Sequence, residues 1–396
     1  MKILLAHNYY RSTAPSGEDI VFKNECDLLE GSGFEVIPFE KFNDDIDDST
    51  LASRVRVALD GAWSKQSYRE VTALIKSAKP DIAHFHNTFP QISPSAYAAC
   101  RENGVPVVQT LHNYRLICAG ALLMREGKPC EICVGRNLLP ALRYRCYRDS
   151  LPATAALAWQ ISRNRIAGVY QNLVDKYIAL TEFAASRFIA AGFLRDSIVV
   201  KPNFLKSDRC IETNKRQPYV VYVGRLSKEK GVMTLIDAWR HLKNIPLKII
   251  GDGPLRSELE GLSSASNLPV EFLGLLPNDE VLGIIASASL QVIPSEWYEG
   301  FPVVILEAYA LGVPVVASRI GSLDEIVIEE ETGLKFEAGN ARDLADKIGS
   351  LFCDPTLMGN MQRQARRVFE LNYTAEANVE LLGSIYADAI FHHRSK

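Results

Sequence analysis

The sequence lacks any apolar run long enough to cross a membrane. It has 396 residues, and no stretch reaches the roughly 18 apolar residues that a spanning helix needs. The longest candidate, residues 151–161, is interrupted by Pro152 and Gln160. The apolar part of residues 1–6 is too short for a secretory signal peptide. We therefore expect a soluble, cytoplasmic protein.

A large net charge and two common nucleotide-binding fingerprints are also missing. The formal net charge is −3 at pH 7, which argues against a nucleic-acid-binding protein. The predicted first strand, residues 2–7, is not followed by G-x-G-x-x-G, so we infer no nicotinamide cofactor. The strand predicted at residues 219–223 is not followed by G-x-x-x-x-G-K-[ST], so ATP hydrolysis is not predicted.

Length and composition predict two well-filled α/β domains. Apolar residues make up 47% of the chain, enough for two cores of about 200 residues each. Predicted strands and helices alternate through both halves, which is typical of doubly wound parallel sheets. We place a Rossmann-like N-terminal domain at residues 1–205, with an insertion at 115–150. A polar linker at 206–218, a second domain at 219–373 and a helical segment at 374–396 complete the chain.

The stretch S-E-W-Y-E-G-F-P-V-V-I-L-E, residues 295–307, carries the strongest functional signal. The apolar run at residues 290–293 predicts a buried parallel strand, which Pro294 ends. Pro302 suits the first turn of a helix, where a missing N–H costs little. The stretch therefore predicts a strand, a loop and a helix over about residues 302–311.

Two glutamates bracket the start of this predicted helix. Glu299 would lie at its N-terminal end, where the free amides of Gly300, Phe301 and the first turn attract anions or hydroxyl-rich groups. Glu307 would lie two turns in, surrounded by apolar residues, and would need a hydrogen-bonding partner there. The alternative interpretation is a helix cap followed by a surface glutamate.

A second polar site is predicted where the second domain begins. The buried strand at residues 219–223 is followed by Gly224 and Arg225, and Lys230 opens the next helix. Two cations and free backbone amides would converge at this point, as a diphosphate requires. The alternative interpretation is an ordinary charged turn.

Two histidines follow predicted strands of the first domain. His86 lies at the carboxyl end of a strand within residues 79–87, and His112 occupies the same place within residues 106–114, followed by Asn113. Ligands of open parallel sheets bind at the carboxyl ends of the strands. We therefore predict a functional role for His112, and either a functional or a structural one for His86.

The insertion contains four cysteines within 29 residues: Cys118, Cys130, Cys133 and Cys146. The middle pair forms C-x-x-C, and this spacing would allow a tetrahedral thiolate site. In a reducing compartment the cysteines are expected to be thiols or metal ligands, not disulfides. One interpretation is a structural zinc site, and the other is free thiols in a loop.

The insertion is also basic, and a predicted apolar helix beginning near Pro152 continues this pattern. Leucines and tyrosines alternate with the basic residues of the insertion. The arginines are Arg136, Arg143, Arg145 and Arg148, followed by Arg163 and Arg165 on the helix. Such a face could contact anionic lipid, bind the pyrophosphate of an acceptor, or be an ordinary solvated surface.

The motifs of the second domain resemble those of a known family. Two glutamates separated by seven residues, in E-G-F-P-V-V-I-L-E-A-Y-A-L-G-V-P-V-V-A-S, resemble the donor motif of the retaining glycosyltransferases of family 4. The segment V-G-R-L-x-x-x-K-G matches the same family. The resemblance implies the GT-B fold, in which two Rossmann-like, doubly wound domains face a cleft. It also implies that the helix at 374–396 crosses back onto the first domain.

The resemblance assigns roles to single residues. Glu299 would hold the sugar and Glu307 the ribose hydroxyls of a nucleotide sugar, while Arg225 and Lys230 would grip the diphosphate. The implied donor-binding set is Gly17, Gly224, Arg225, Lys230, Pro277, Glu299, Gly300, Phe301, Pro302 and Glu307. His112 matches the family's T-x-H position near the transferred sugar, which makes it catalytic together with Glu299, Lys230 and Arg225. We place His86 and Asn113 on the acceptor or sugar side.

The implied activity is the transfer of a hexose from a UDP- or GDP-sugar with retention of configuration. The leaving diphosphate would accept the proton of the acceptor, so no cofactor is required. The segments H-N-T-F-P, L-H-N-Y-R-L-I-C and C-E-I-C resemble those of bacterial enzymes that build surface polysaccharides. The acceptor would then be a saccharide, free or linked to polyprenyl lipid, at the cytoplasmic face of the inner membrane.

Two alternatives remain at this point. A related enzyme of the same fold, such as a nucleotide-sugar epimerase or a phosphorylase, would release a different product. We identify no lysine that would hold the pyridoxal phosphate of a phosphorylase. A non-catalytic nucleotide-sugar-binding protein would bind the donor without turnover.

Overall fold

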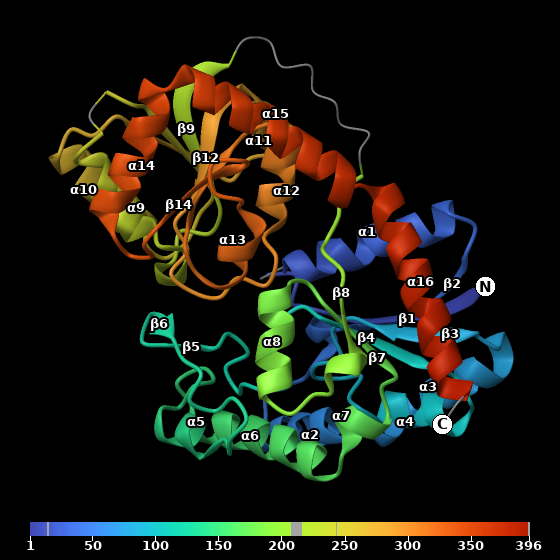
Figure 1. The fold of residues 1–396 in the computed structure, drawn as a ribbon. Helices are drawn as coiled ribbons and strands as arrows, with labels where there is room; N and C mark the ends of the chain where they lie inside the picture. Colours follow the sequence, from blue (N-terminus) through green and yellow to red (C-terminus); the bar gives the residue numbers. More distant parts are fainter. Residues whose placement is uncertain (14–15, 207–215, 243, 395–396) are drawn as a thin grey trace. The chain divides into compact units, whose positions relative to one another are not determined.

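The computed structural model describes residues 1–13, 16–206, 216–242 and 244–394. The chain divides into two compact units (Figure 1). The first unit comprises residues 1–123, 131–203 and 378–396, and the second comprises residues 124–130 and 204–377. Each unit contains one parallel six-stranded sheet. The prediction of two parallel α/β domains is therefore confirmed.

The first sheet has the strand order β2-β1-β3-β4-β7-β8. Its strands are β1 (Lys2–Tyr9), β2 (Glu35–Phe42), β3 (Ile82–Phe85), β4 (Val107–Leu111), β7 (Lys176–Ala179) and β8 (Ile198–Val200). All five pairings are parallel. The chain moves outward in opposite directions from the β1–β3 pair, so the order reverses there. Ligands of such sheets bind at this reversal, beyond the carboxyl ends of the strands.

The helices of the first unit connect these strands. They are α1 (Gly17–Gly31), η1 (Asn43–Asp45), α2 (Leu51–Ala62), α3 (Lys65–Ala78), α4 (Ser95–Glu102), α5 (Leu139–Arg143), α6 (Leu151–Ile166), α7 (Val169–Asn172), α8 (Glu182–Ala190) and η2 (Arg195–Ser197). Helix α1 begins where its sequence favours a start: Ser16 caps it, and Asp19 completes a capping box. A short hairpin, β5 (Met124–Arg125) and β6 (Lys128–Pro129), lies within the insertion.

The C-terminal helix α16 (Ala375–Arg394) supplies part of the core of the first unit. Its buried residues Leu382, Ile385, Tyr386 and Ala389 belong to the same apolar cluster as residues of β1 and α1. Residues 378–396 thus return to the unit in which the chain begins. Because this helix fills one face of the first sheet, we expect that unit to need the end of the chain in order to be stable.

The second sheet has the strand order β11-β10-β9-β12-β13-β14. Its strands are β9 (Gln217–Val223), β10 (Leu247–Ile250), β11 (Val270–Gly274), β12 (Ala288–Ile293), β13 (Val315–Ser318) and β14 (Gly333–Phe336). The helical segments are η3 (Lys228–Lys230), α9 (Val232–Trp239), α10 (Arg256–Ala265), α11 (Asn278–Ser287), α12 (Val303–Ala310), α13 (Gly321–Ile326), α14 (Ala341–Cys353) and α15 (Pro355–Asn372). The order reverses between β9 and β12, as in dinucleotide-binding sheets.

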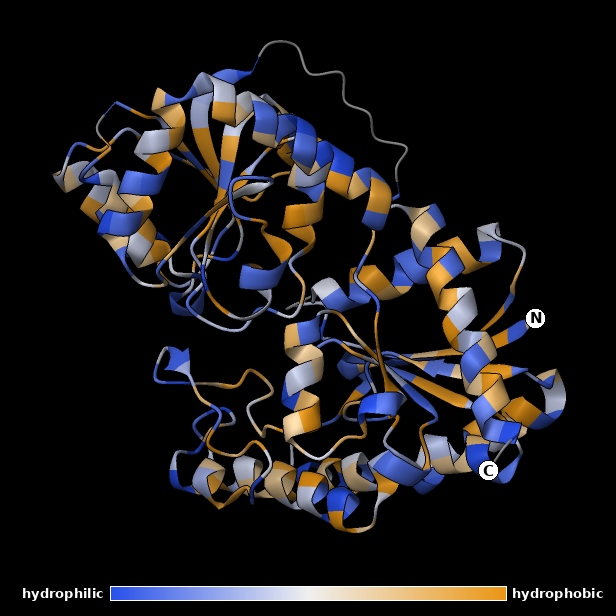
Figure 2. Ribbon diagram, viewed as in Figure 1, coloured by the Kyte–Doolittle hydropathy of each residue, from blue (hydrophilic) through white to orange (hydrophobic). Residues whose placement is uncertain are grey.

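Apolar residues gather on the strands of both units, while the helices carry both apolar and polar residues (Figure 2). Strands buried on both faces form nearly continuous apolar runs, as parallel sheets covered by helices require. In the second unit the strand residues Val220, Leu247, Leu290 and Val316 share one buried cluster with α9 and α14. Within the described ranges, no helix is long and apolar enough to cross a membrane.

Three predicted boundaries need adjustment. Residues 207–215 of the predicted linker lie outside the described residues, and β9 already begins at Gln217. Pro302 caps helix α12 from outside, in an extended conformation, so the helix starts at Val303. Lys230 ends a short 3-10 turn, and Gly231 caps the helix that follows.

Candidate active site

The reversal point of the second sheet brings together the loops that follow β9, β10 and β12. A Cβ atom on Gly231, which has a φ of +67°, would lie 1.7 Å from the carbonyl oxygen of Pro294. A Cβ on Gly251, which has a φ of +129°, would lie 2.0 Å from the carbonyl oxygen of Gly224. Only glycine permits these approaches. The two glycines therefore hold the loops that carry Arg225, Lys230 and Glu299 against one another.

Lys230 and Glu299 contact each other directly. The Nζ atom of Lys230 lies 2.7 Å from Oε1 of Glu299. Ser295 donates its hydroxyl to the same oxygen at 2.6 Å. Glu299 is only 6% exposed, so its charge depends on these two partners. Both residues were predicted from the sequence, but their ion pair was not.

Trp297 lies beside this ion pair. The Nζ atom of Lys230 lies 5.3 Å from the centroid of the Trp297 ring, within the range of a cation–π interaction. The indole N–H of Trp297 is buried and has no hydrogen-bond partner among the residues that the structure describes. A buried donor without a partner is costly and calls for an explanation, such as an ordered water or a bound ligand. Sequence reasoning missed this residue, although it lies inside the E-W-Y-E-G-F-P segment.

The guanidinium group of Arg225 is available to bind a ligand, whereas the amide of Gly224 is not. Arg225 is exposed, and its guanidinium group makes no hydrogen bond to any described residue, while its carbonyl oxygen accepts from the Tyr222 hydroxyl at 2.9 Å. Gly224 instead uses its amide in the sheet, donating to Ile250 O at 3.0 Å. Arg225 can therefore receive an anion, whereas the Gly224 amide is already engaged.

The N-terminal end of helix α12 is arranged largely as the sequence predicts. The amide of Gly300 has no partner among the described residues, whereas that of Ile305, in the first helical turn, donates to the carbonyl oxygen of Pro302 at 3.1 Å. Phe301 is buried and lies edge-on to Tyr373, with ring centroids 5.8 Å apart. Glu307 is only partly buried, because it shares the more open side of α12 with Val303 and Val304. The apolar sequence around Glu307 predicted a buried side chain, whereas the structure leaves it partly exposed.

Pro277 caps helix α11 at the end of the loop after β11. This loop follows the outermost strand on the β10 side of the sheet. Gly17 belongs to the first unit, where it is the first residue of α1. Apart from its chain neighbours and its own helix backbone, no atom of the described residues lies within 4 Å of the position that its Cβ would take. Gly17 thus leaves open space at the start of α1.

The reversal point of the first sheet brings His86 and His112 together. The Nδ1 atom of His86 lies 2.9 Å from Nε2 of His112, with the ring planes inclined by 26° and the ring centroids 5.1 Å apart. The other nitrogen of His86, Nε2, lies 3.0 Å from Oε1 of Glu25. Burial lowers the pKa of His86 to about 4, and it lowers the pKa of His112 well below the usual range. Both rings are therefore neutral at pH 7.

Asn113 binds a second carboxylate near the start of α1. Its Nδ2 atom donates to Oε1 of Glu18 at 2.8 Å, and the Tyr10 hydroxyl donates to the other oxygen at 3.2 Å. Burial raises the pKa of Glu18, although these bonds and the nearby Arg115 oppose the shift. Sequence reasoning did not single out Glu18, because it reads as an ordinary acidic residue of a first helical turn.

The four cysteines do not form a ligand cluster in the structure. Among the described residues, the one group of three or more potential ligand atoms within 4.8 Å of one another is Glu25, His84 and His86. Cys133 is buried in a small apolar cluster with Cys146 packed against it. Cys118 and Cys146 both approach Gly120. The structural zinc site stays a prediction that needs metal analysis.

Two family models cover nearly the whole chain. The model of glycosyl transferases group 1 matches residues 205–368, and that of Glycosyltransferase Family 4 matches residues 26–209. The alpha-D-kanosaminyltransferase of Streptomyces kanamyceticus is 31% identical over 342 residues, covering 83% of this chain and 84% of that protein. This chain therefore belongs to glycosyltransferase family 4.

Other relatives are matched over a shorter part. The sulfoquinovosyl transferase of Arabidopsis thaliana is 31% identical over 250 residues, which cover 60% of this chain and 48% of that protein. A glycosyltransferase of Methanocaldococcus jannaschii is matched over 47% of its own length. The chain thus spans about half the length of these two relatives.

Solved structures show the same fold. A glycosyltransferase from Rickettsia africae superposes with a TM-score of 0.69 at 16% identity, covering 98% of both chains. Anabaena HepE in complex with UDP and glucose superposes with a TM-score of 0.65 at 18% identity, covering 98% of this chain and 100% of that one. The fold of this chain is GT-B, as its sequence predicts.

Proposed function

We propose that this protein transfers a hexose from a UDP- or GDP-sugar to a saccharide acceptor with retention of configuration. The observation that carries the proposal is the Lys230–Glu299 pair at the reversal point of the second sheet, where Lys230 Nζ and Glu299 Oε1 are 2.7 Å apart. A cation and an acid at this place match the two needs of a nucleotide sugar. The cation meets the diphosphate, and the acid meets the hydroxyl groups of the sugar.

Donor binding would redistribute the contacts of this pair. The diphosphate would bind Lys230, the exposed guanidinium of Arg225 and the free amide of Gly300. Glu299 would then exchange its bond to Lys230 for a sugar hydroxyl, while Ser295 continues to hold its carboxylate. The N–H of Trp297, which has no partner among the described residues, could donate to an oxygen of the donor.

The chemistry would depend on electrostatic stabilisation. As the glycosidic bond breaks, negative charge develops on the β-phosphate, and the fixed cations and amides stabilise it without reorganisation. The leaving phosphate oxygen accepts the proton of the acceptor hydroxyl on the same face of the sugar, so no protein nucleophile is required. Because the protein supplies the positive charge, we expect full activity without Mg²⁺. Loss of activity in EDTA that Mg²⁺ restores would contradict this expectation.

The remaining predicted residues take supporting roles in this proposal. Glu307 would accept hydrogen bonds from the ribose hydroxyls, and Pro277 would contact the base. On the first unit, His112, His86 and Asn113 would face the transferred sugar or the acceptor. These three residues and Gly17 lie around the reversal point of the first sheet and the start of α1, where a GT-B enzyme can bind a polar ligand.

We further propose that the acceptor is carried on lipid and that the first unit touches an anionic membrane. Helices α2 and α6 are neighbours, because Gln160 donates to the carbonyl oxygen of Ala58 at 2.5 Å. Both expose apolar side chains: Leu51, Val55 and Leu59 on α2, and Leu151, Trp159 and Ile166 on α6. The three residues of α2 are spaced four apart and share one face.

Exposed arginines accompany these apolar residues. Arg54 and Arg56 lie on α2, and Arg163 lies on α6. Arg143 and Arg145 of the insertion are also exposed. Apolar side chains next to cations are typical of helices that lie in the interface of anionic lipid. Leu51→Asp should reduce co-sedimentation with phosphatidylglycerol vesicles, whereas Leu371→Asp on α15 should not, although Leu371 is also largely exposed (64%, against 79% for Leu51). Equal binding to neutral and anionic vesicles would exclude the contact.

The deciding experiment is product analysis with a panel of UDP- and GDP-sugars and with saccharide and lipid-linked acceptors. The proposal predicts one glycosylated product whose anomeric configuration equals that of the donor. Inversion of configuration would exclude the retaining mechanism. A changed nucleotide sugar without transfer would indicate an epimerase, and binding without any turnover would indicate a sensor.

A further inference from the structure

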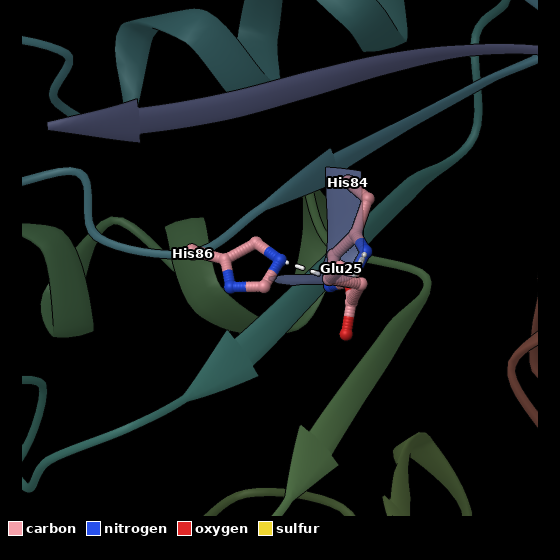
Figure 3. A group of neighbouring side chains, drawn as sticks. All are labelled: Glu25, His84 and His86. Carbon is pink, nitrogen blue, oxygen red and sulfur yellow. Dashed lines mark hydrogen bonds and ion pairs between the residues drawn. The ribbon is translucent and has the colours of Figure 1, made fainter. Parts of the chain in front are cut away.

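Glu25, on the inner side of helix α1, is the centre of a buried charged network in the first unit. It is 1% exposed, and its carboxylate lies near three basic groups: two histidines at the end of β3 and one lysine after β8. Oε1 lies 3.1 Å from Nδ1 of His84 and 3.0 Å from Nε2 of His86 (Figure 3). Oε2 lies 3.2 Å from Nζ of Lys201. Although burial opposes ionisation, Lys201 and the two histidines hold the pKa of Glu25 well below its usual range.

The polar groups around Glu25 form hydrogen bonds with one another, so they constitute a hydrogen-bond network and not a metal site. The ammonium group of Lys201 occupies one side of the carboxylate and also lies 3.2 Å from Oδ1 of Asn378. Both nitrogens of His84 are engaged, Nδ1 with the Tyr386 hydroxyl and Nε2 with the Thr110 hydroxyl, each at 2.8 Å. A cation beside Lys201 would be repelled, and His84 has no nitrogen left to bind it.

The network decides where the proton of His86 lies. An ionised carboxylate only accepts hydrogen bonds, so Nε2 of His86 must carry a proton and donate to Glu25. The ring of His86 is neutral at pH 7, because burial lowers its pKa to about 4. A neutral imidazole has one proton, so Nδ1 of His86 carries a lone pair and accepts.

The tautomer of His86 determines the tautomer of His112. Nδ1 of His86 lies 2.9 Å from Nε2 of His112. Since Nδ1 of His86 can only accept, Nε2 of His112 must donate. The ring of His112 is also neutral, so its single proton is on Nε2 and its Nδ1 atom keeps a lone pair. No residue in the described ranges forms a hydrogen bond to this Nδ1 atom, and His112 is only partly buried.

We propose that Glu25 and His86 are positioning residues that fix His112 as the Nε2-protonated tautomer, so that its Nδ1 atom accepts a hydrogen bond from a hydroxyl group of the sugar. This inference rests on the proposed function, in which His112 faces the sugar. His112 is then an acceptor that orients a hydroxyl group, and it does not donate a proton to the leaving group. Lys201 balances the charge of Glu25 and keeps the carboxylate ionised.

The direct test is the tautomer of His112, measured by long-range ¹H–¹⁵N correlation spectra of the full-length protein labelled with ¹⁵N-histidine. The His112 signals are identified by their absence in His112→Gln. We expect pyrrole-type Nε2 and pyridine-type Nδ1 at pH 7. A proton on Nδ1, or a doubly protonated ring, overturns the proposal. No substrate is present, so this result does not depend on whether the protein transfers sugars.

Variants of the two buried histidines separate positioning from structural support. His86→Phe removes the partner of His112, whereas His84→Phe removes an equally buried histidine of the same network that does not touch His112. The spectrum of His112 should change in His86→Phe and stay unchanged in His84→Phe. An equal change in both variants would show that the network acts only through stability.

Transfer assays give a second readout. Loss of the outer partner of a metal-binding histidine typically costs about 10- to 100-fold; by analogy, His86→Phe should lower kcat by a similar factor with a smaller change in KM. His86→Gln should recover most of kcat, because an amide can donate to Glu25 and accept from His112. If Gln and Phe lose kcat equally, the positioning role is rejected. If no variant and no wild-type protein transfers any sugar, the proposed function fails while the tautomer result stands.

Discussion

The charged residues near the points where the strand order reverses differ between the two sheets: in the first unit they are buried, and in the second the cations are accessible. In the first unit, Glu25 and Lys201 form an ion pair whose side chains are 1% and 2% exposed, and histidines complete their hydrogen bonds. In the second unit, Lys230 is partly exposed and Arg225 is exposed. A buried pair cannot exchange partners with a ligand without a large desolvation cost, whereas an open pair can. The first arrangement therefore fixes geometry, and the second is available for binding.

The largest expected effect follows from breaking the buried pair. Lys201→Met leaves the carboxylate of Glu25 buried without its cation, and removing one partner of such a pair costs about 3–5 kcal/mol. Urea titration should show this loss for the unfolding transition of the first unit. The same substitution in the second unit, Lys230→Met, should cost less, because the Lys230 side chain is 26% exposed and Ser295 still donates to the carboxylate of Glu299. Equal losses in the two variants would contradict the comparison.

Lys230→Met should lose more activity than Lys201→Met, which is the reverse of their expected order in lost stability. Lys230→Met removes a cation that stabilises developing charge, and such losses lower kcat by about 10²–10³-fold. Folded Lys201→Met, assayed below its melting range, should lose far less. Initial rates with the preferred donor measure both. Normal turnover in Lys230→Met would remove this residue from the proposed site.

A third difference between the two units should appear in how stability depends on pH. In the folded protein the pKa of His86 is about 4, against 6.5 for an ordinary histidine, so the unfolded chain binds a proton first as the pH falls. Stability is therefore greatest above pH 6.5, and about 3 kcal/mol is lost as the pH falls from 6.5 to 4. Glu25, whose pKa is depressed, adds a further loss below its ordinary value. Urea titrations across this range should show a smaller slope in His86→Gln, and an unchanged slope would contradict the assignment.

The smallest effect concerns Arg225. Its guanidinium is exposed and makes no hydrogen bond to any described residue, so Arg225→Ala should leave stability unchanged. It should weaken UDP binding about tenfold, which is the value of one charge-assisted contact of about 1.4 kcal/mol. Isothermal titration with UDP measures the change. Arg225→Lys should recover only part of the affinity, because an ammonium group cannot form two parallel hydrogen bonds.

The functional segments could be predicted from the sequence where they are continuous along the chain. The strand, loop and helix around Glu299 and the strand before Arg225 are continuous segments, recognisable from apolar runs and from Pro294 and Pro302. The direct contact of Lys230 with Glu299 was not predictable in the same way, since 69 residues separate them. It depends on the glycine at position 231, which allows its loop to approach Pro294 at the start of the loop that carries Glu299.

The network of the first unit was almost invisible in the sequence. Glu25 lies on an amphipathic helix and reads as a surface residue, yet its partner Lys201 is 176 residues away. Tyr386 and Asn378 reach the network from the last helix of the chain. No local pattern signals a charge that is buried by elements so distant, and only the histidines at the strand ends indicated a polar site there.

The most direct test of the account is a crystal structure of the protein with bound UDP or GDP. The account predicts that the diphosphate lies beyond the carboxyl ends of β9 and β12, in contact with Arg225, Lys230 and the amide of Gly300. A nucleotide bound instead beside β1 and β3 of the first unit would contradict it.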